Sequence, residues 1–248
     1  MTTLPSLQLR IGCVSLGQGP RPDLEDLHQR LFAGHGRSVE LVWRHVLDDL
    51  TAQGIAAMSA RDGQPAIRSV LRDAEPTWLD RDSFAPLVAR AVKALEDEGD
   101  VNLTIVCAAE ELPTLQLRSA RPVILPARAM AAYAQVLAVT RPDAHIGLVT
   151  YGVRQREQQL AGWAAFPWAR ELRMSFSSNG GDLEAAAADL LPDPPELIFV
   201  WAYGAGILPG SPGPAILSAR TGAPVILASV AAVGLAHVLL PQCEGRRA

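Results

Sequence analysis

Cys107 ends the apolar run VNLTIVC, at the point where a strand is expected to meet a loop. A thiol near a helix start or a cation ionises readily and can then act as a base or a nucleophile. Cysteine is also a common buried apolar residue, so for this residue taken alone a purely structural role is the more common interpretation. Glu110 and Glu111 follow closely, and a nearby carboxylate would raise the pKa of the thiol.

The stretch SLGQGPRPDL (15–24) could hold an anion. Gly17 and Gly19 let the backbone turn tightly, and Pro22 suits the first turn of a helix, whose amides carry partial positive charge. Arg21 adds a bidentate cation that suits a carboxylate or a phosphate. The Walker and dinucleotide-binding patterns are both absent. A tight turn with a solvated arginine explains the same residues.

Three further loops carry polar groups after expected strands. In each, a purely structural role competes with ligand binding. The structural alternatives are, in the order of the loops given next, a long turn, a helix cap and solvent-exposed acidic residues. The candidates are Tyr203 and Gly204 in VWAYGAG, Ser177, Ser178, Asn179 and Gly180 in SSNGGD, and Asp48 in HVLDDLT.

Strands and helices alternate along most of the chain and would position these loops. This alternation predicts an α/β fold of mostly parallel sheets with helices on both faces. The expected strands are 9–16, 39–45, 101–107, 145–150, 171–175, 197–201 and 224–228. The expected helices are 22–33, 82–98, 127–140, 154–164, 181–191, 212–221 and 229–240.

A shallow internal symmetry predicts two facing three-layer α/β lobes with a ligand cleft between the carboxyl ends of their strands. The first lobe is expected over 1–125 and the second over 126–222. A strand and helix over 223–248 can return to the first lobe. Residues 48–79 interrupt the first lobe. Within them, 66–71 and 76–79 could form an inserted hairpin, which either caps the cleft or has no role in ligand binding.

Composition excludes several classes of protein. The net charge is −4 and no basic block stands out, so a nucleic-acid surface is not expected. The uncharged segment 223–240 contains proline, serine, glycine and histidine and is better explained as a strand and a buried helix than as a membrane span. Three cysteines without paired spacing indicate a reducing, cytoplasmic setting, and the five scattered histidines do not indicate a metal site.

Taken in order, these pieces resemble the AroM family. The resemblance rests on IGCVSLGQGPRPDL (11–24), HVLDDLTAQGIAAMSARDGQPAIRSVLRD (45–73), LQLRSARPVILPARAM (115–130) and PVILASVAAVGLAHVLL (224–240). Its most specific element is the Gly-Gln-x-Pro-Arg-x-Asp pattern, which includes Gln18 and Arg21. The Leu-Asp-x-Leu pattern around Asp48 comes next.

The family is in turn similar to the aspartate/glutamate/hydantoin racemase superfamily. That resemblance implies two lobes with the site between them, and two thiols that exchange a proton with opposite faces of an α-carbon, without metal or pyridoxal phosphate. Cys107 matches the first thiol, but the usual Thr-Gly after it is replaced by Ala108 and Ala109. The second-lobe segment reads Trp-Ala-Tyr-Gly (201–204) and lacks the second thiol, while Cys13 lies inside the first expected strand and Cys243 in the tail.

A single thiol disfavours two-base racemisation. The sequence therefore leaves two hypotheses: a cofactor-independent isomerase, racemase or lyase acting on a small carboxylate, or a non-catalytic protein that binds a small anion. In the first, Cys107 and Tyr203 are the catalytic candidates. In either, the expected ligand-binding residues are Gly17, Gln18, Gly19, Arg21, Asp48, Ser177, Ser178, Asn179, Gly180 and Gly204. The resemblance also suggests a homodimer.

Overall fold

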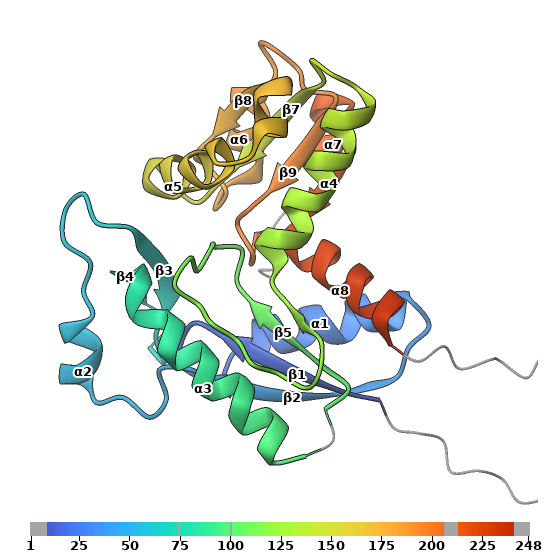
Figure 1. Ribbon diagram of the computed structural model, residues 1–248. Helices are drawn as coiled ribbons and strands as arrows, with labels where there is room; N and C mark the ends of the chain where they lie inside the picture. The colour runs from blue at the N-terminus through green and yellow to red at the C-terminus, as the bar shows by residue number, and fades with distance from the viewer. Residues whose placement is uncertain (1–8, 74, 100, 206–212, 241–248) are drawn as a thin grey trace, which may run out of the picture.

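The chain folds into two α/β lobes that face each other (Figure 1). The computed structural model describes residues 9–73, 75–99, 101–205 and 213–240. Each lobe contains a four-stranded parallel sheet, as the alternation of strands and helices predicts.

The first sheet has the strand order β2-β1-β5-β6. Its strands are β1 (Leu9–Ser15), β2 (Val39–His45), β5 (Leu103–Cys107) and β6 (Val123–Ile124). Helices α1 (Pro22–Gly34) and α8 (Ala228–Leu239) pack on one face, and α3 (Phe84–Asp97) packs on the other. Apolar side chains of β1 alternate between these faces, so Ile11 and Cys13 belong to one core and Val14 to the other.

The second sheet, read as β8-β7-β9-β10, repeats the order of the first. Its strands are β7 (His145–Val149), β8 (Arg173–Ser177), β9 (Leu197–Val200) and β10 (Val225–Leu227). Helices α6 (Leu183–Leu190) and α7 (Ala215–Thr221) cover one face. The other face packs on α4 (Pro126–Thr140), α5 (Val153–Ala164) and the 3-10 turn Pro167–Glu171.

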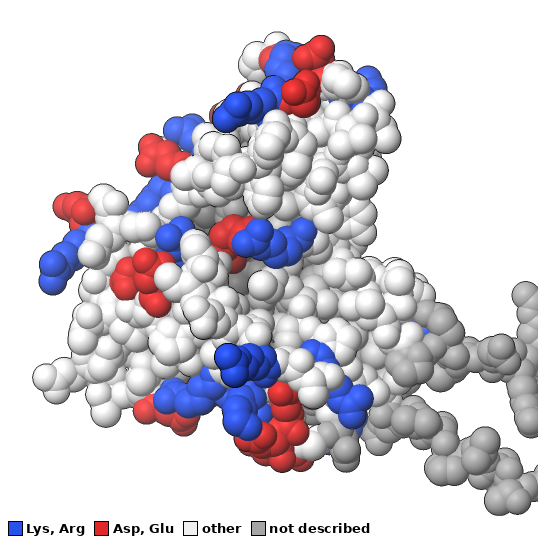
Figure 2. Space-filling model, in the orientation of Figure 1, with Lys and Arg blue, Asp and Glu red and all other residues white. Residues whose placement is uncertain are grey.

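Helices α4 and α8 join the lobes. Each follows the last strand of its own sheet, and the two pack against each other. Helix α8 then contacts α1 and β5 of the first lobe, so one apolar core runs continuously from the first sheet to the second. Their outer faces are apolar and exposed, and the surface over α4 is largely uncharged in Figure 2. The exposed side chains are Tyr133, Val136, Val139, Leu235, Val238 and Leu239.

The interruption of the first lobe contains the expected hairpin, β3 (Ala66–Val70) paired antiparallel with β4 (Pro76–Asp80). A short helix, α2 (Ala52–Ala57), precedes it and is capped by the Thr51 side chain. The backbone amide of Gln18 donates to the Val70 carbonyl (3.0 Å), which attaches the hairpin to the β1–α1 loop. From the second lobe, Arg154 donates to the carbonyls of Arg61 (2.6 Å) and Gln64 (2.9 Å). The hairpin therefore spans the two lobes.

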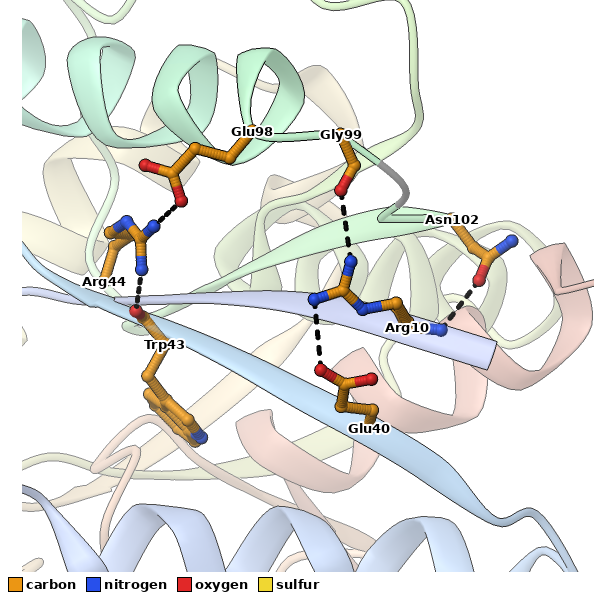
Figure 3. A network of polar contacts seen from close by, with 7 residues as sticks. All are labelled: Arg10, Glu40, Trp43, Arg44, Glu98, Gly99 and Asn102. Atoms are coloured by element: carbon orange, nitrogen blue, oxygen red, sulfur yellow. Dashed lines mark hydrogen bonds and ion pairs between the residues drawn. The ribbon is translucent and has the colours of Figure 1, made fainter. Parts of the chain in front are cut away.

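A separate polar network ties the first sheet to the C-terminal end of α3 and the segment that follows it (Figure 3). Arg10 pairs with Glu40 of the neighbouring strand (3.0 Å) and donates to the Gly99 carbonyl (3.2 Å). Its backbone amide donates to Asn102 (2.8 Å), and Arg44 pairs with Glu98 at the end of α3. The Arg10 contacts lie at the amino ends of the strands, whereas Arg44 is the last but one residue of β2; the carboxyl ends of the strands line the space between the lobes.

Several element boundaries differ from the sequence prediction by one to three residues. Strand β8 begins at Arg173 rather than 171, because Pro167 starts a 3-10 turn that runs to Glu171. The two-residue strand β6 and the six-residue helix α2 carry too short a periodic pattern to be predicted. Within the residues that the structure describes, the helices are all too short or too polar to cross a membrane.

Candidate active site between the lobes

Cys107 lies at the floor of a cavity between the lobes. It ends β5, in register with Ser15 at the end of β1, and is 6% exposed. The cavity volume is about 70 Å³, so the site in this conformation suits a small ligand. Its walls come from the carboxyl ends of β1, β5, β7 and β9, from α1 and from the hairpin. The polar lining residues are Ser15, Arg21, Arg68, Ser69, Cys107, Glu110, Tyr151 and Tyr203.

His28 is a titratable partner of Cys107. It lies on the buried stripe of α1 with Leu24 and Phe32, each four residues away. The Nδ1–H group donates to the Leu24 carbonyl (2.7 Å), because a carbonyl can only accept. The other ring nitrogen, Nε2, therefore faces both Cys107 Sγ (3.6 Å) and the Tyr203 hydroxyl (2.9 Å).

This arrangement favours a thiolate at Cys107. Burial alone raises the pKa of the thiol, but three neighbours outweigh burial: a hydrogen bond from Cys13, the charge and hydrogen bond of His28, and the Tyr203 hydroxyl. Together they lower the pKa of Cys107 to about 5. Burial lowers the pKa of His28, yet the charge on Cys107 raises it above its ordinary value. The lowered pKa of Cys107 and the raised pKa of His28 both favour a thiolate–imidazolium pair.

Cys13 and Tyr203 remain protonated and serve as donors. Cys13 faces the same side of the first sheet as Cys107, because it is in register with Ile105, two residues before Cys107. Burial and the charge on Cys107 raise the pKa of both the Cys13 thiol and the Tyr203 phenol. Cys13 was not expected to take part in the site; its place in β1 brings it there.

The hairpin forms the opposite wall. The Arg68 guanidinium lies over the ring of Tyr151 from the second lobe, 4.8 Å from its centroid. Burial raises the pKa of Tyr151 to about 12 and raises the pKa of Glu110 above its ordinary value. Gln155 donates to Glu110 (2.9 Å), so this carboxyl is held by the second lobe although it follows β5.

Arg21 lines the cavity, as expected, but its guanidinium group already forms an ion pair with Asp23. Its Nε and Nη2 donate to the two carboxylate oxygens of Asp23, at 2.8 and 2.6 Å. Burial would raise the pKa of Asp23, but Arg21 outweighs burial and holds that pKa below its ordinary value. This internal ion pair leaves Arg21 less able to bind a second carboxylate.

The rest of the β1–α1 loop contacts the hairpin. A Cβ at Gly17 would lie 2.5 Å from the Val70 carbonyl oxygen, so glycine permits this close approach. Gly19 donates to Asp48 (2.9 Å) and accepts from Arg72 (3.0 Å), and Gln18 Oε1 accepts from the Arg72 amide (3.2 Å). The cavity lining does not include Gly17, Gln18, Gly19 or Asp48.

The SSNGGD loop is occupied by contacts to α6. Ser177 Oγ and Asn179 Nδ2 both donate to Asp189, at 2.7 and 2.8 Å. Gly180 donates to the Thr150 carbonyl (2.7 Å), and a Cβ there would meet Ala202. Ser178 has a buried hydroxyl without a hydrogen-bond partner among the described residues. These four residues lie outside the cavity lining, whereas Tyr203 and Gly204 of the second lobe belong to it.

Within the described part of the chain, the cavity contains one thiol. Cys13 and Cys107 both belong to the first sheet, and Cys243 lies outside the described residues. The second-lobe segment places Tyr203 on the same side as Cys107, because both contact one nitrogen of His28. Charged side chains of both signs are interspersed over the face in Figure 2.

The arrangement of two facing parallel sheets is similar to the fold of two solved racemases. An allantoin racemase from Klebsiella pneumoniae aligns with a TM-score of 0.54 at 14% identity, covering 94% of this chain and 87% of that chain. A glutamate racemase from Aquifex pyrophilus aligns with a TM-score of 0.50 at 13% identity, covering 94% and 84%. At these identities the likeness shows the fold alone.

The chain belongs to the AroM family. Residues 11–240 match the family described as AroM protein, which is nearly the full length and agrees with the resemblance found in the sequence. No curated protein matched the chain. The fold and the family are therefore established, and the chemistry has to be argued from the site.

Proposed function

We propose that this protein is a cofactor-independent enzyme of the isomerase, racemase or lyase type, acting at the α-carbon of a small carboxylate. The single observation that carries the proposal is the Cys107–His28 pair at the floor of a small cavity with guanidinium groups on its walls. A buried thiolate beside an imidazolium is a reactive group, and perturbed pKa values of this kind are typical of functional sites.

The thiolate acts as the base. Cys107 Sγ takes the α-proton, the electron pair of the C–H bond stays on the substrate as an enolate, and the cationic side chains of the cavity stabilise its charge. The new thiol then returns the proton to the same face of this carbon, which exchanges the α-proton with solvent, or to a neighbouring carbon of the delocalised anion, which gives an isomer. In a lyase, carbon dioxide leaves first with the carbanion electron pair left on carbon, and the proton of the His28 imidazolium reaches carbon through Cys107.

Protonation from one side fits this site better than two-base racemisation. Tyr203 shares the His28 nitrogen with Cys107, so it does not oppose the thiol across the substrate. A phenol with a raised pKa is also a poor base near neutral pH. We therefore assign Tyr203 to hydrogen bonding at the thiolate.

The test is isotope exchange. The protein is incubated in D₂O with amino acids, hydantoins and substituted malonates, and α-proton exchange and carbon dioxide release are followed by NMR. Exchange or decarboxylation should vanish in Cys107→Ala and persist in Cys243→Ser, which removes a thiol from the tail. Turnover that survives in Cys107→Ala would refute the assignment.

A binding protein is the second candidate, and the lack of a second thiol within the described residues favours it. In that case the lobes hold a small anion without converting it. Calorimetric binding of one member of the same panel, unchanged in Cys107→Ala and without exchange in D₂O, would favour the binder over the enzyme.

A further inference from the structure

Arg68 is a cavity residue that the sequence patterns did not single out. It lies in β3 of the inserted hairpin, is partly buried, and lines the cavity with Cys107. Its guanidinium stacks on Tyr151, 4.8 Å from the ring centroid. This cation–π contact holds the planar fork in place and leaves its edge available for hydrogen bonds.

The other arginines near the cavity are already engaged. Arg21 is bound by Asp23 through two nitrogens, Arg72 pairs with Asp48 (3.3 Å), and Arg154 donates to two backbone carbonyls. Among the described residues, no carboxylate oxygen lies within 4.0 Å of the Arg68 guanidinium. Arg68 is thus the cavity arginine that lacks an ion-pair partner in this part of the chain.

Glu110 interacts electrostatically with Arg68 but forms no ion pair with it within 4.0 Å. Burial raises the pKa of Glu110, so this carboxyl ionises less readily, although Arg68 acts in the opposite direction. The next residue, Ser69, also lines the cavity, and its buried hydroxyl has no hydrogen-bond partner among the described residues. A partly buried guanidinium is stabilised by a hydrogen-bonded anion, and a carboxylate matches its fork.

We propose that Arg68 is the carboxylate-binding residue of the cavity, and that the inserted hairpin supplies it over Cys107. The ligand class is a small molecule with a free carboxylate. The inference rests on the proposed function for the role of Cys107, but it differs from the anion site expected at Arg21. It also gives the hairpin a function beyond covering the cleft.

A pair of alkylating reagents tests the proposal without knowledge of the substrate. Iodoacetate carries a carboxylate and iodoacetamide is its neutral counterpart; with both, the thiolate sulfur forms a bond to carbon and iodide leaves. The rate of Cys107 alkylation is measured for each reagent by mass spectrometry of the Cys107 peptide. We expect a preference for iodoacetate in the wild type, reduced about tenfold to a hundredfold in Arg68→Gln, since hydrogen bonds to charged groups contribute on this scale.

Two variants separate binding from general electrostatics. Arg61→Gln removes the same charge from an exposed position before the hairpin and should leave the preference unchanged. Arg68→Lys keeps the positive charge but lacks the planar guanidinium with its paired donors, so it should retain only part of the preference for iodoacetate. An equal loss in Arg61→Gln and Arg68→Gln, or no preference in the wild type, would overturn the proposal.

A second measurement does not depend on alkylation. Malonate should raise the melting temperature of the wild type and of Arg61→Gln at constant ionic strength, but not that of Arg68→Gln. Equal shifts in all three proteins, or no shift in the wild type, would again contradict the assignment. Failure of the proposed function looks different: isotope exchange is then missing while the Arg68-dependent preference and malonate binding persist.

Discussion

The thiolate at Cys107 should depend on His28, and replacing this histidine by glutamine tests the dependence. Glutamine keeps a polar side chain but removes the cation. In the wild type the pKa of Cys107 is lowered from 9.0 to about 5, against the effect of burial. His28 contributes through both its charge and a hydrogen bond, whereas Cys13 and Tyr203 contribute hydrogen bonds alone.

We therefore expect the pKa of Cys107 to rise by about two units or more in His28→Gln. At pH 6 the thiolate fraction would fall from about 90% to about 10% or less. The assay is the thiolate absorbance at 240 nm followed against pH, with the Cys107→Ser titration subtracted so that other thiols cancel. The pH profile of iodoacetamide alkylation at the Cys107 peptide gives an independent midpoint.

The matched control is His45→Gln. His45 lies at the same edge of the sheet, but its Nδ1 contacts Ser15 Oγ (2.7 Å) instead of the thiol, so the midpoint should stay near that of the wild type. Cys13→Ala should also raise the pKa of Cys107, because it removes a thiol donor, and Cys13→Ser should restore much of the effect. A midpoint in His28→Gln that stays within half a unit of the wild-type value would refute this account of the thiolate.

Three other predictions follow from the geometry. Burial raises the pKa of Glu110 in the folded protein above its value in the unfolded chain. The wild type therefore loses stability as the pH rises from the unfolded-state pKa to the folded-state pKa of this carboxyl. Over that pH range the melting temperature of Glu110→Gln should increase relative to that of the wild type, and above it the difference should level off. Gly17→Ala would place a Cβ 2.5 Å from the Val70 carbonyl and should lower the unfolding free energy in urea by about 1–3 kcal/mol, whereas Gly34→Ala, with open space around it, should not. Val136 is 65% exposed on the apolar outer face of α4. If this face forms the homodimer that the resemblance suggests, Val136→Asp should reduce the mass measured by light scattering. A monomeric wild type would contradict this expectation.

The fold could be read from the sequence because its signals are local. Apolar runs ending in turn residues predict the strands, and the hairpin over 66–80 follows from two such runs close together. Strand β8 was misplaced because the turn begun by Pro167 is irregular and has no clear periodicity. Cys107 was identifiable because the end of a parallel strand is a known place for functional groups.

The partners of Cys107 were harder to predict because they depend on long-range packing. His28 is 79 residues away, and its part in the site depends on how α1 rotates against the sheet. A signal existed, since a histidine at four-residue spacing between Leu24 and Phe32 occupies a buried stripe. Arg68 gave no signal, because the orientation of an inserted hairpin is set by contacts with both lobes.

The hairpin is attached to the two lobes by different kinds of contact. The first-lobe attachment includes the backbone bond from Gln18 to Val70, where the chains approach closely at Gly17. The second-lobe attachments are the Arg68 guanidinium on the Tyr151 ring and the Arg154 side chain on carbonyls of the loop before the hairpin, such as that of Gln64. The first-lobe attachment thus includes a backbone hydrogen bond, whereas the second-lobe attachments described above are made by side chains. In the proposed enzyme, opening the cavity on the side of the second lobe would break these side-chain contacts, and a rate limited by that opening would fall as solvent viscosity rises.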